Sequence, residues 1–185
     1  MARPEFRIQN SEFRMKTRLL LVSLLSLFYL FPKIASAESP YVLPYPGIMP
    51  GNRLYIVKEI KNFLDKFWYF GDISQFKYNL SLSDEYLVES KTLFEYKQYV
   101  LALKSLEKSS KYYVNADKYI ERALENGKDT TDIDNLYKNA GEKHGELLVK
   151  LKNEIPESFF WEAENEEGKN LLLHKEIERA IRKLR

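Results

Sequence analysis

The amino-acid sequence predicts an all-α fold, an antiparallel bundle of about four to five helices behind a cleaved signal peptide. The main observation is a run of apolar and small residues from Tyr99 to Leu124 that recurs in alternating steps of three and four. This spacing places the whole run on one face of a helix. A second run with the same spacing extends from Ile73 to Phe94. No strand-like alternation occurs after the apolar N-terminal run, so we expect helices to build the core.

The N-terminal region has the pattern of a secretory signal peptide. Basic residues precede an apolar run over residues 19–31, and Ala35 and Ala37 supply the small residues of a cleavage site. The run is shorter than the roughly 20 residues that span a bilayer as a helix, which favours cleavage; a retained membrane anchor is the alternative. Either way the protein is expected to be exported, as a secreted protein or on the extracytoplasmic face of the membrane. Translation could start at Met1 or Met15, and Met15 fits the signal pattern better.

Charge and composition argue against several classes of function. The chain carries 29 basic and 27 acidic residues, of which residues 1–37 hold six and two, so residues 38–185 carry 23 and 25, a net charge of −2. Because nucleic-acid binding depends on neutralising phosphates, we expect no nucleic-acid partner. Cysteine is absent, which excludes disulfides, thiolate metal sites and cysteine nucleophiles.

After the signal, an extended segment leads into a first helix. Three prolines and two glycines between Tyr41 and Asn52 disfavour regular structure there, although its apolar residues suggest partial docking. Asn52 can cap a helix over residues 53–70, whose broad apolar stripe predicts packing into the core. The alternative is a helix on a membrane surface, for which Lys58, Lys61 and Lys66 would be suited.

The remaining helices follow from caps and periodicity. Asp72 can cap a second helix to about Tyr96, and Lys97 and Gln98 then form a tight corner into the helix that ends at Asn126 and Gly127. A fourth helix is expected over residues 133–154 and an amphipathic last helix from about residue 171. The expected division of the chain is therefore 1–37 (extension and signal peptide), 38–52 (extended segment), 53–155 (bundle core) and 156–185 (C-terminal helical segment).

Small residues are predicted to bring the second and third helices close together. Ser83 and Ser90 interrupt one apolar run, and Ala102, Ser109 and Ala116 lie on the other. A helical-repeat solenoid is a minor alternative, because no repeat at the period of about 34 residues that tetratricopeptide arrays require is found.

Two stretches resemble an uncharacterised bacterial family of exported proteins, domain of unknown function 5667. The opening LPYPGIMPGNRLY, followed by Lys58, and LSDEYLVE from Leu82 to Glu89 are similar to that family's motifs. Arg53 replaces a usual proline, and Glu85 and Tyr86 replace two usual basic residues. The resemblance implies an exported helical bundle, often tethered to a membrane, and implies no activity.

Candidate sites are few. His144 lies on the apolar face of the fourth helix and is expected to be a hydrogen-bonded core residue; metal binding with His174 is the alternative, which their spacing disfavours. Asp84 is expected to bond a tyrosine or lysine across the bundle. We find no phosphate loop, nucleophile elbow, zinc motif or dinucleotide fingerprint, so we expect no enzyme and no cofactor.

The surface is expected to act through tyrosines. Of the 13 tyrosines, several lie off the apolar runs, and tyrosine is enriched at protein interfaces. The candidates for an interface are Tyr45, Tyr86, Tyr112 and Tyr119. The sequence therefore predicts a non-enzymatic, protein-binding or structural adaptor domain of the bacterial cell envelope that meets the membrane only through an uncleaved signal segment. The alternative is a sensor that binds a small ligand or a metal between its helices.

Overall fold

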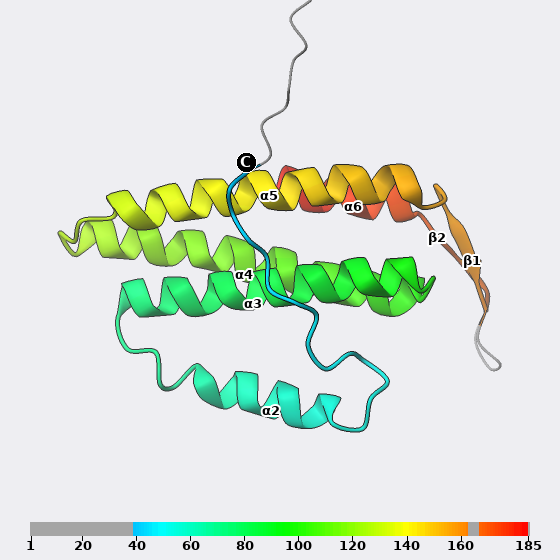
Figure 1. Ribbon diagram of the computed structural model, residues 1–185, viewed down its shortest axis with the longest axis horizontal. Coiled ribbons are helices and arrows are strands. Elements are labelled where there is room, and N and C mark those ends of the chain that lie inside the picture. The colour runs from blue at the N-terminus through cyan, green and yellow to red at the C-terminus, as the bar shows by residue number, and fades with distance from the viewer. Residues whose placement is uncertain (1–38, 163–166, 185) are drawn as a thin grey trace, which may run out of the picture. The chain divides into compact units, whose positions relative to one another are not determined.

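The computed structural model describes residues 39–162 and 167–184, and over these residues the fold is a helical bundle, as predicted (Figure 1). The predicted signal peptide and its cleavage site at Ala35 and Ala37 lie outside the described residues. The elements in order are α2 (Tyr55–Asp65), α3 (Asp72–Glu95), α4 (Tyr99–Glu125), α5 (Thr131–Glu154), β1 (Phe159–Trp161), β2 (Lys169–Leu171) and α6 (Leu173–Arg182). In the described part of the chain, no helix combines the length and apolar character needed to cross a membrane.

The antiparallel pair α3 and α4 is the centre of the bundle, and small residues hold the two helices together. The Ser83 hydroxyl donates to the carbonyl of Ser109 at 3.0 Å, and the Ser109 hydroxyl donates back to the carbonyl of Ser83 at 2.8 Å. Two helical turns further along α3, the Ser90 hydroxyl donates to the carbonyl of Ala102 at 2.9 Å. The predicted close-packing positions are therefore confirmed, and their hydroxyls are satisfied by the facing backbone.

The two ends of α4 are set by left-handed residues. Lys97 has φ 59° in the corner between α3 and α4, and Gly127 has φ 69° directly after α4. At the latter the amide of Lys128 donates to the carbonyl of Ala123 at 3.0 Å, the bond that closes a Schellman motif. Both turns lie where the sequence predicts them.

Helices α5 and α6 complete the core against α3 and α4. Leu148 and Leu151 from α5 and Leu173 and Ile177 from α6 are at most 3% exposed and pack in one cluster with residues of α3 and α4. Helix α6 is amphipathic, so this inner face is buried and its charged residues face solvent. The first and last predicted helices thus differ, because α6 joins the core whereas α2 does not.

A short hairpin corrects the expectation that strands are absent. Strands β1 and β2 pair antiparallel, with Phe159 opposite Leu171, and connect α5 to α6 (Figure 1). The ring of Phe159 lies 4.7 Å from that of Tyr99, which fastens the hairpin to α4. Strands of three residues are too short to show a period-two pattern in the sequence, and this is why they were not predicted.

The two glycines of α5 give a matched test of this packing. A Cβ atom on Gly141 would lie 2.3 Å from the hydroxyl of Tyr113, which is 1% exposed, whereas a Cβ on Gly145 would meet only Leu184 at 4.0 Å. We expect Gly141→Ala to lower the free energy of unfolding by about 1–3 kcal/mol through overpacking. Gly145→Ala should leave it unchanged or raise it by up to about 1 kcal/mol, the helix-propensity gain. Urea denaturation measures both; equal effects of the two variants would contradict this packing.

Candidate functional site

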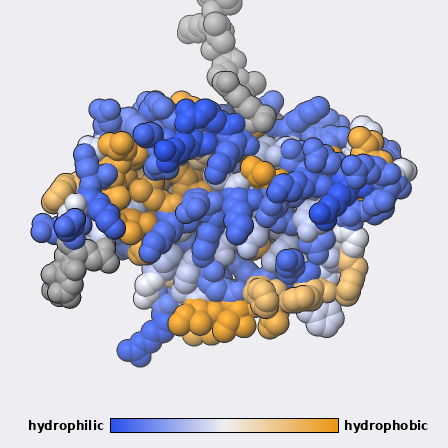
Figure 2. Space-filling model, turned by 180° about the vertical axis from the view of Figure 1, so that it is seen from behind, coloured by the Kyte–Doolittle hydropathy of each residue, from blue (hydrophilic) through white to orange (hydrophobic). Residues whose placement is uncertain are grey.

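Helix α2 presents its apolar residues to solvent, which corrects the prediction that they pack into the core. Val57, Ile60, Phe63 and Leu64 are 51–63% exposed, and Ile56 is 68% exposed. Figure 2 shows a band of apolar surface along the lower edge of the molecule, where Figure 1 places α2. We call this set the α2 face; it consists of Leu54, Ile56, Val57, Ile60, Phe63, Leu64, Phe67, Trp68 and Phe70. The sequence pattern identified the residues that share the face but not the direction in which the face points.

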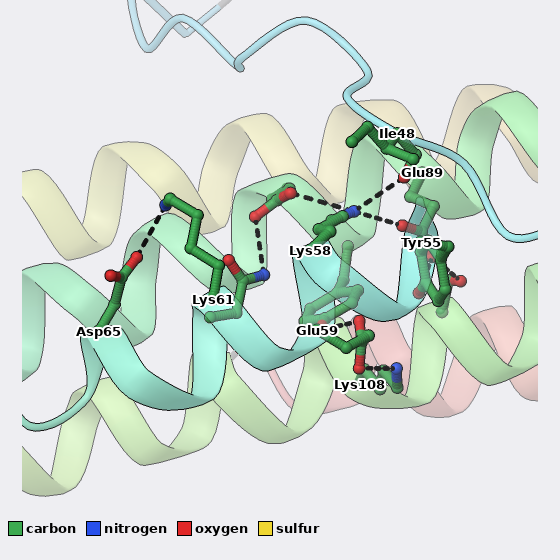
Figure 3. A network of polar contacts seen from close by, with 12 residues as sticks. Ile48, Tyr55, Lys58, Glu59, Lys61, Asp65, Glu89 and Lys108 are labelled. Atoms are coloured by element: carbon green, nitrogen blue, oxygen red, sulfur yellow. Dashed lines mark hydrogen bonds and ion pairs between the residues drawn. The ribbon is translucent and has the colours of Figure 1, made fainter. Parts of the chain in front are cut away.

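The opposite side of α2 is polar and lies against α3. Lys58 is 8% exposed, and its ammonium lies 2.7 Å from Glu89 Oε2 and 3.0 Å from Glu85 Oε1 (Figure 3). It also donates to the carbonyl of Ile48 in the preceding extended segment at 3.3 Å. A buried ammonium between two carboxylates links three segments of the chain, and pairing of this kind is what makes burial of its charge tolerable.

Glu89 is the most deeply buried member of this network, at 1% exposed. Its Oε1 accepts the hydroxyls of Tyr55 at 3.0 Å and Ser105 at 2.5 Å, while Oε2 accepts Lys58. The carboxylate therefore bonds residues from α2, α3 and α4 together. Both of its oxygens accept hydrogen bonds from side chains of this network, and Glu89 lines none of the three cavities described below.

A second ion pair holds the polar side of α2 against α3 and α4. Glu59 Oε2 lies 2.8 Å from the ammonium of Lys108 on α4, and Glu59 Oε1 accepts the hydroxyl of Tyr86 at 2.6 Å (Figure 3). The Lys108 ammonium lies 4.8 Å from the centre of the Tyr86 ring, within range of a cation–π contact. Tyr86 is 2% exposed, so it is a buried member of this network and not available as the interface residue that the sequence suggested.

The ionisation of the network follows from these contacts. Burial by itself would lower the pKa of Lys58, but its bonds to Glu89 and Glu85 outweigh burial and raise that pKa above its ordinary value. Burial would likewise raise the pKa of Glu59, but Lys108 and Tyr86 outweigh it and lower that pKa. Both side chains are therefore charged at neutral pH, so α2 is held by ion pairs in this range.

A separate buried cluster anchors the extended segment to α3 and α5. His144 is 1% exposed and its Nε2 lies 2.6 Å from Asp84 Oδ1, while Oδ2 of Asp84 accepts the hydroxyl of Tyr41 at 2.5 Å. Burial and the Asp84 carboxylate raise the pKa of the Tyr41 hydroxyl, which stays protonated and donates. The amide of Ser39 adds a bond to Glu146 at 2.8 Å. The prediction of a hydrogen-bonded core histidine is confirmed. Asp84 was expected to bond a tyrosine or lysine across the bundle; it does bond a tyrosine, but Tyr41 belongs to the extended segment, and its partner across the bundle is His144.

The two histidines have different partners. His174 Nε2 lies 3.1 Å from the carbonyl of Ile155, and His144 bonds Asp84. Among residues 39–162 and 167–184, no group of three or more His, Cys, Asp or Glu side chains could hold a metal ion. Cavities of about 710, 720 and 520 Å³ occur on this part of the chain, and His144 lines none of these three.

The other predicted interface tyrosines are scattered over the surface. Tyr45 is 95% exposed in the extended segment, Tyr112 is stacked on Tyr86 with ring centres 5.6 Å apart, and the ring of Tyr119 lies 5.2 Å from the guanidinium of Arg122. They do not form a single patch, whereas the α2 face does.

Sequence reasoning missed the network under α2. The polar residues Tyr55, Lys58, Glu59 and Asn62 recur in steps of three, one and three, which places them on one side of a helix opposite the apolar stripe. Their partners on α3 lie off the apolar run that was identified there. Two facing polar stripes were a signal of this contact, but sequence does not show which helices face each other.

Removing the buried ammonium tests the network. We expect Lys58→Met to lower the free energy of unfolding by about 3–5 kcal/mol, because it leaves the Glu89 carboxylate buried without a counter-ion. Lys61→Met is the matched control, since Lys61 pairs with Asp65 on the surface with its side chain 71% exposed, and we expect a loss of at most about 1 kcal/mol. Urea denaturation compares them. Lys58→Met/Glu89→Gln should recover part of the loss, and equal losses in the two single variants would refute the network's role.

The Glu59 pair predicts acid sensitivity in α2. The pKa of Glu59 is lowered from its ordinary value of 4.5, so the stabilisation is fully present above that value and is lost as the pH falls through the folded-state pKa. Amide hydrogen exchange of α2 should therefore accelerate relative to that of α4 below about pH 4.5, once the intrinsic pH dependence is subtracted. Glu59→Gln, which lacks the titrating group, should show a smaller change; an identical acid response would exclude Glu59 as its source.

Comparisons of this chain with protein-family models, with curated proteins and with solved structures find no match. The resemblance to domain of unknown function 5667 therefore stays a prediction.

Proposed function

We propose that this protein is an exported, non-enzymatic helical bundle that serves as an attachment or adaptor module of the bacterial cell envelope, with α2 as its contact element. The single observation that carries the proposal is the orientation of α2. Its charged side is bonded to α3 and α4 through Lys58 and Glu59, and its apolar side faces outward. Exposed apolar patches of more than a few hundred Å² mark interaction sites.

The interior polar groups support a structural role for the rest of the bundle. Glu89, Asp84 and His144 each bond side chains from other elements. A general acid or base must instead reach a substrate. Asp84 borders the cavity of about 520 Å³, but both of its oxygens are already bonded. This favours the attachment module over the alternative of a ligand or metal sensor.

A change confined to the α2 face tests the proposal. The variant Ile60→Ser/Phe63→Ser/Phe67→Ser alters side chains that are 54–63% exposed, so the fold should persist. In cells that export the full chain, its recovery with the envelope fraction should fall about tenfold or more, since each buried apolar side chain contributes about 1.5–3 kcal/mol to an interface.

The control for this experiment changes apolar residues that are equally exposed elsewhere. Leu124→Ser/Val149→Ser alters residues of α4 and α5 that are 64% and 51% exposed, and it should fractionate like the wild type. Circular dichroism of both variants verifies folding. The proposal is wrong if the triple variant remains with the envelope as the wild type does.

A further inference from the structure

The composition of the α2 face indicates what kind of surface it contacts. Aromatic residues gather at its C-terminal end, where Phe67, Trp68 and Phe70 are 61%, 78% and 80% exposed. Aliphatic residues make up much of the remainder, including Ile56, Val57 and Ile60. Each aromatic side chain can bury about 150–250 Å², so the face is large for a surface exposed to water.

Charge is distributed asymmetrically around this face. Arg53, Lys61 and Lys66 are exposed beside it. The acidic residues of α2 are paired and lie further in: Asp65 is 35% exposed where its partner Lys61 is 71% exposed, and Glu59 is bound to Lys108. Asp65 offsets Lys61, and the acidic residues of α2 do not offset Arg53 or Lys66, so the rim of the α2 face has an excess of positive charge, although residues 38–185 as a whole carry a net charge of −2.

We propose that the α2 face lies in the interface of a lipid bilayer that contains anionic lipids, with α2 parallel to the membrane plane. This inference rests on the proposed function and names its partner. An apolar face with tryptophan and phenylalanine, bordered by basic residues, is the composition of helices that bind at the boundary of headgroups and acyl chains. The indole of Trp68 suits that boundary, because its ring is apolar and its N–H is polar.

The dimensions of α2 agree with this placement. Its 11 residues make a rod of about 16 Å, too short to span a hydrocarbon core of about 30 Å but suited to lie along its surface. The buried bonds of Lys58 and Glu59 hold the helix with its apolar side outward before any contact is made. The helix therefore does not need to fold or turn over on binding.

The charges favour a lipid surface over a second copy of this chain. Pairing two α2 faces would bring the unpaired basic residues of one rim, Arg53 and Lys66, toward the same basic rim of the other copy, since a twofold interface joins identical patches. Anionic headgroups neutralise the same rim. The predicted signal peptide, which would direct the chain to a membrane for export, is consistent with this partner.

Vesicle binding tests the proposal directly. All proteins are full chains that are exported and purified in the same way, so that any N-terminal segment that remains is the same in each. All of them carry Trp161→Phe, so that Trp68 is the tryptophan whose fluorescence is measured. With vesicles of phosphatidylglycerol and phosphatidylethanolamine we expect co-sedimentation and a blue shift of Trp68 emission. Binding to phosphatidylcholine vesicles should be at least about tenfold weaker, because the basic rim then lacks anionic partners. Added salt should weaken binding to the anionic vesicles.

The variants give each outcome a meaning. Ile60→Ser/Phe63→Ser/Phe67→Ser should bind anionic vesicles about tenfold or more weakly than the wild type, and Leu124→Ser/Val149→Ser should bind as the wild type does. Equal binding by all three proteins, or no binding by the wild type, overturns the lipid assignment. If in that case the triple variant is still recovered less with the envelope fraction than the wild type, the proposed function stands, with a protein as the partner. Dimerisation in analytical ultracentrifugation that the triple variant abolishes would identify a second copy instead.

Discussion

The orientation of α2 depends on one buried interaction, the ammonium of Lys58 between the carboxylates of Glu89 and Glu85. Glu89 is 1% exposed, so without Lys58 a carboxylate would remain uncompensated in the interior, at a cost of several kcal/mol. A rotation of α2 that turned its apolar stripe inward would carry Lys58 away from both carboxylates. The arrangement with the apolar face outward is therefore the one in which the buried charges of α3 are satisfied.

The extended segment before α2 is attached in the same manner. Tyr41 bonds the Asp84 carboxylate that also binds His144, and Leu43 packs on the main core cluster. The carbonyl of Ile48 then accepts Lys58. Apolar seams build the α3–α6 bundle, while directional bonds to buried carboxylates of α3 decide how the outer segments lie on it. Directional bonds specify one geometry, whereas apolar contact alone tolerates several.

The extent to which the sequence predicts this structure follows from the same distinction. The alternation of three and four along α3 and α4 predicts their packing, including the contacts of Ser83 and Ser90, because both helices bury the face that the pattern marks. For α2 the pattern again identifies a face, but its direction depends on Glu89, a residue about thirty positions away whose environment no local pattern records. His144 was predictable because a polar residue on an apolar stripe has few alternatives to a buried bond.

The outward direction of the α2 face also lowers the stability of the isolated chain, and this is relevant to the role that we propose for the face. Burying an Ile, Leu or Phe side chain stabilises a protein by about 1.5–3 kcal/mol, and the exposed α2 face forgoes this stabilisation at several positions. The buried ion pair does not replace it, because such pairs roughly break even against apolar packing. A sequence selected for stability alone would replace Lys58 and Glu89 by apolar residues and turn the stripe inward. The network instead keeps this surface exposed, and the free energy of burying its apolar side chains would be gained if the partner that we propose covered it. These buried charges hold α2 with its apolar side outward, although apolar residues in place of both partners would be about as stable or more so, and this is why we propose that the function lies on this face.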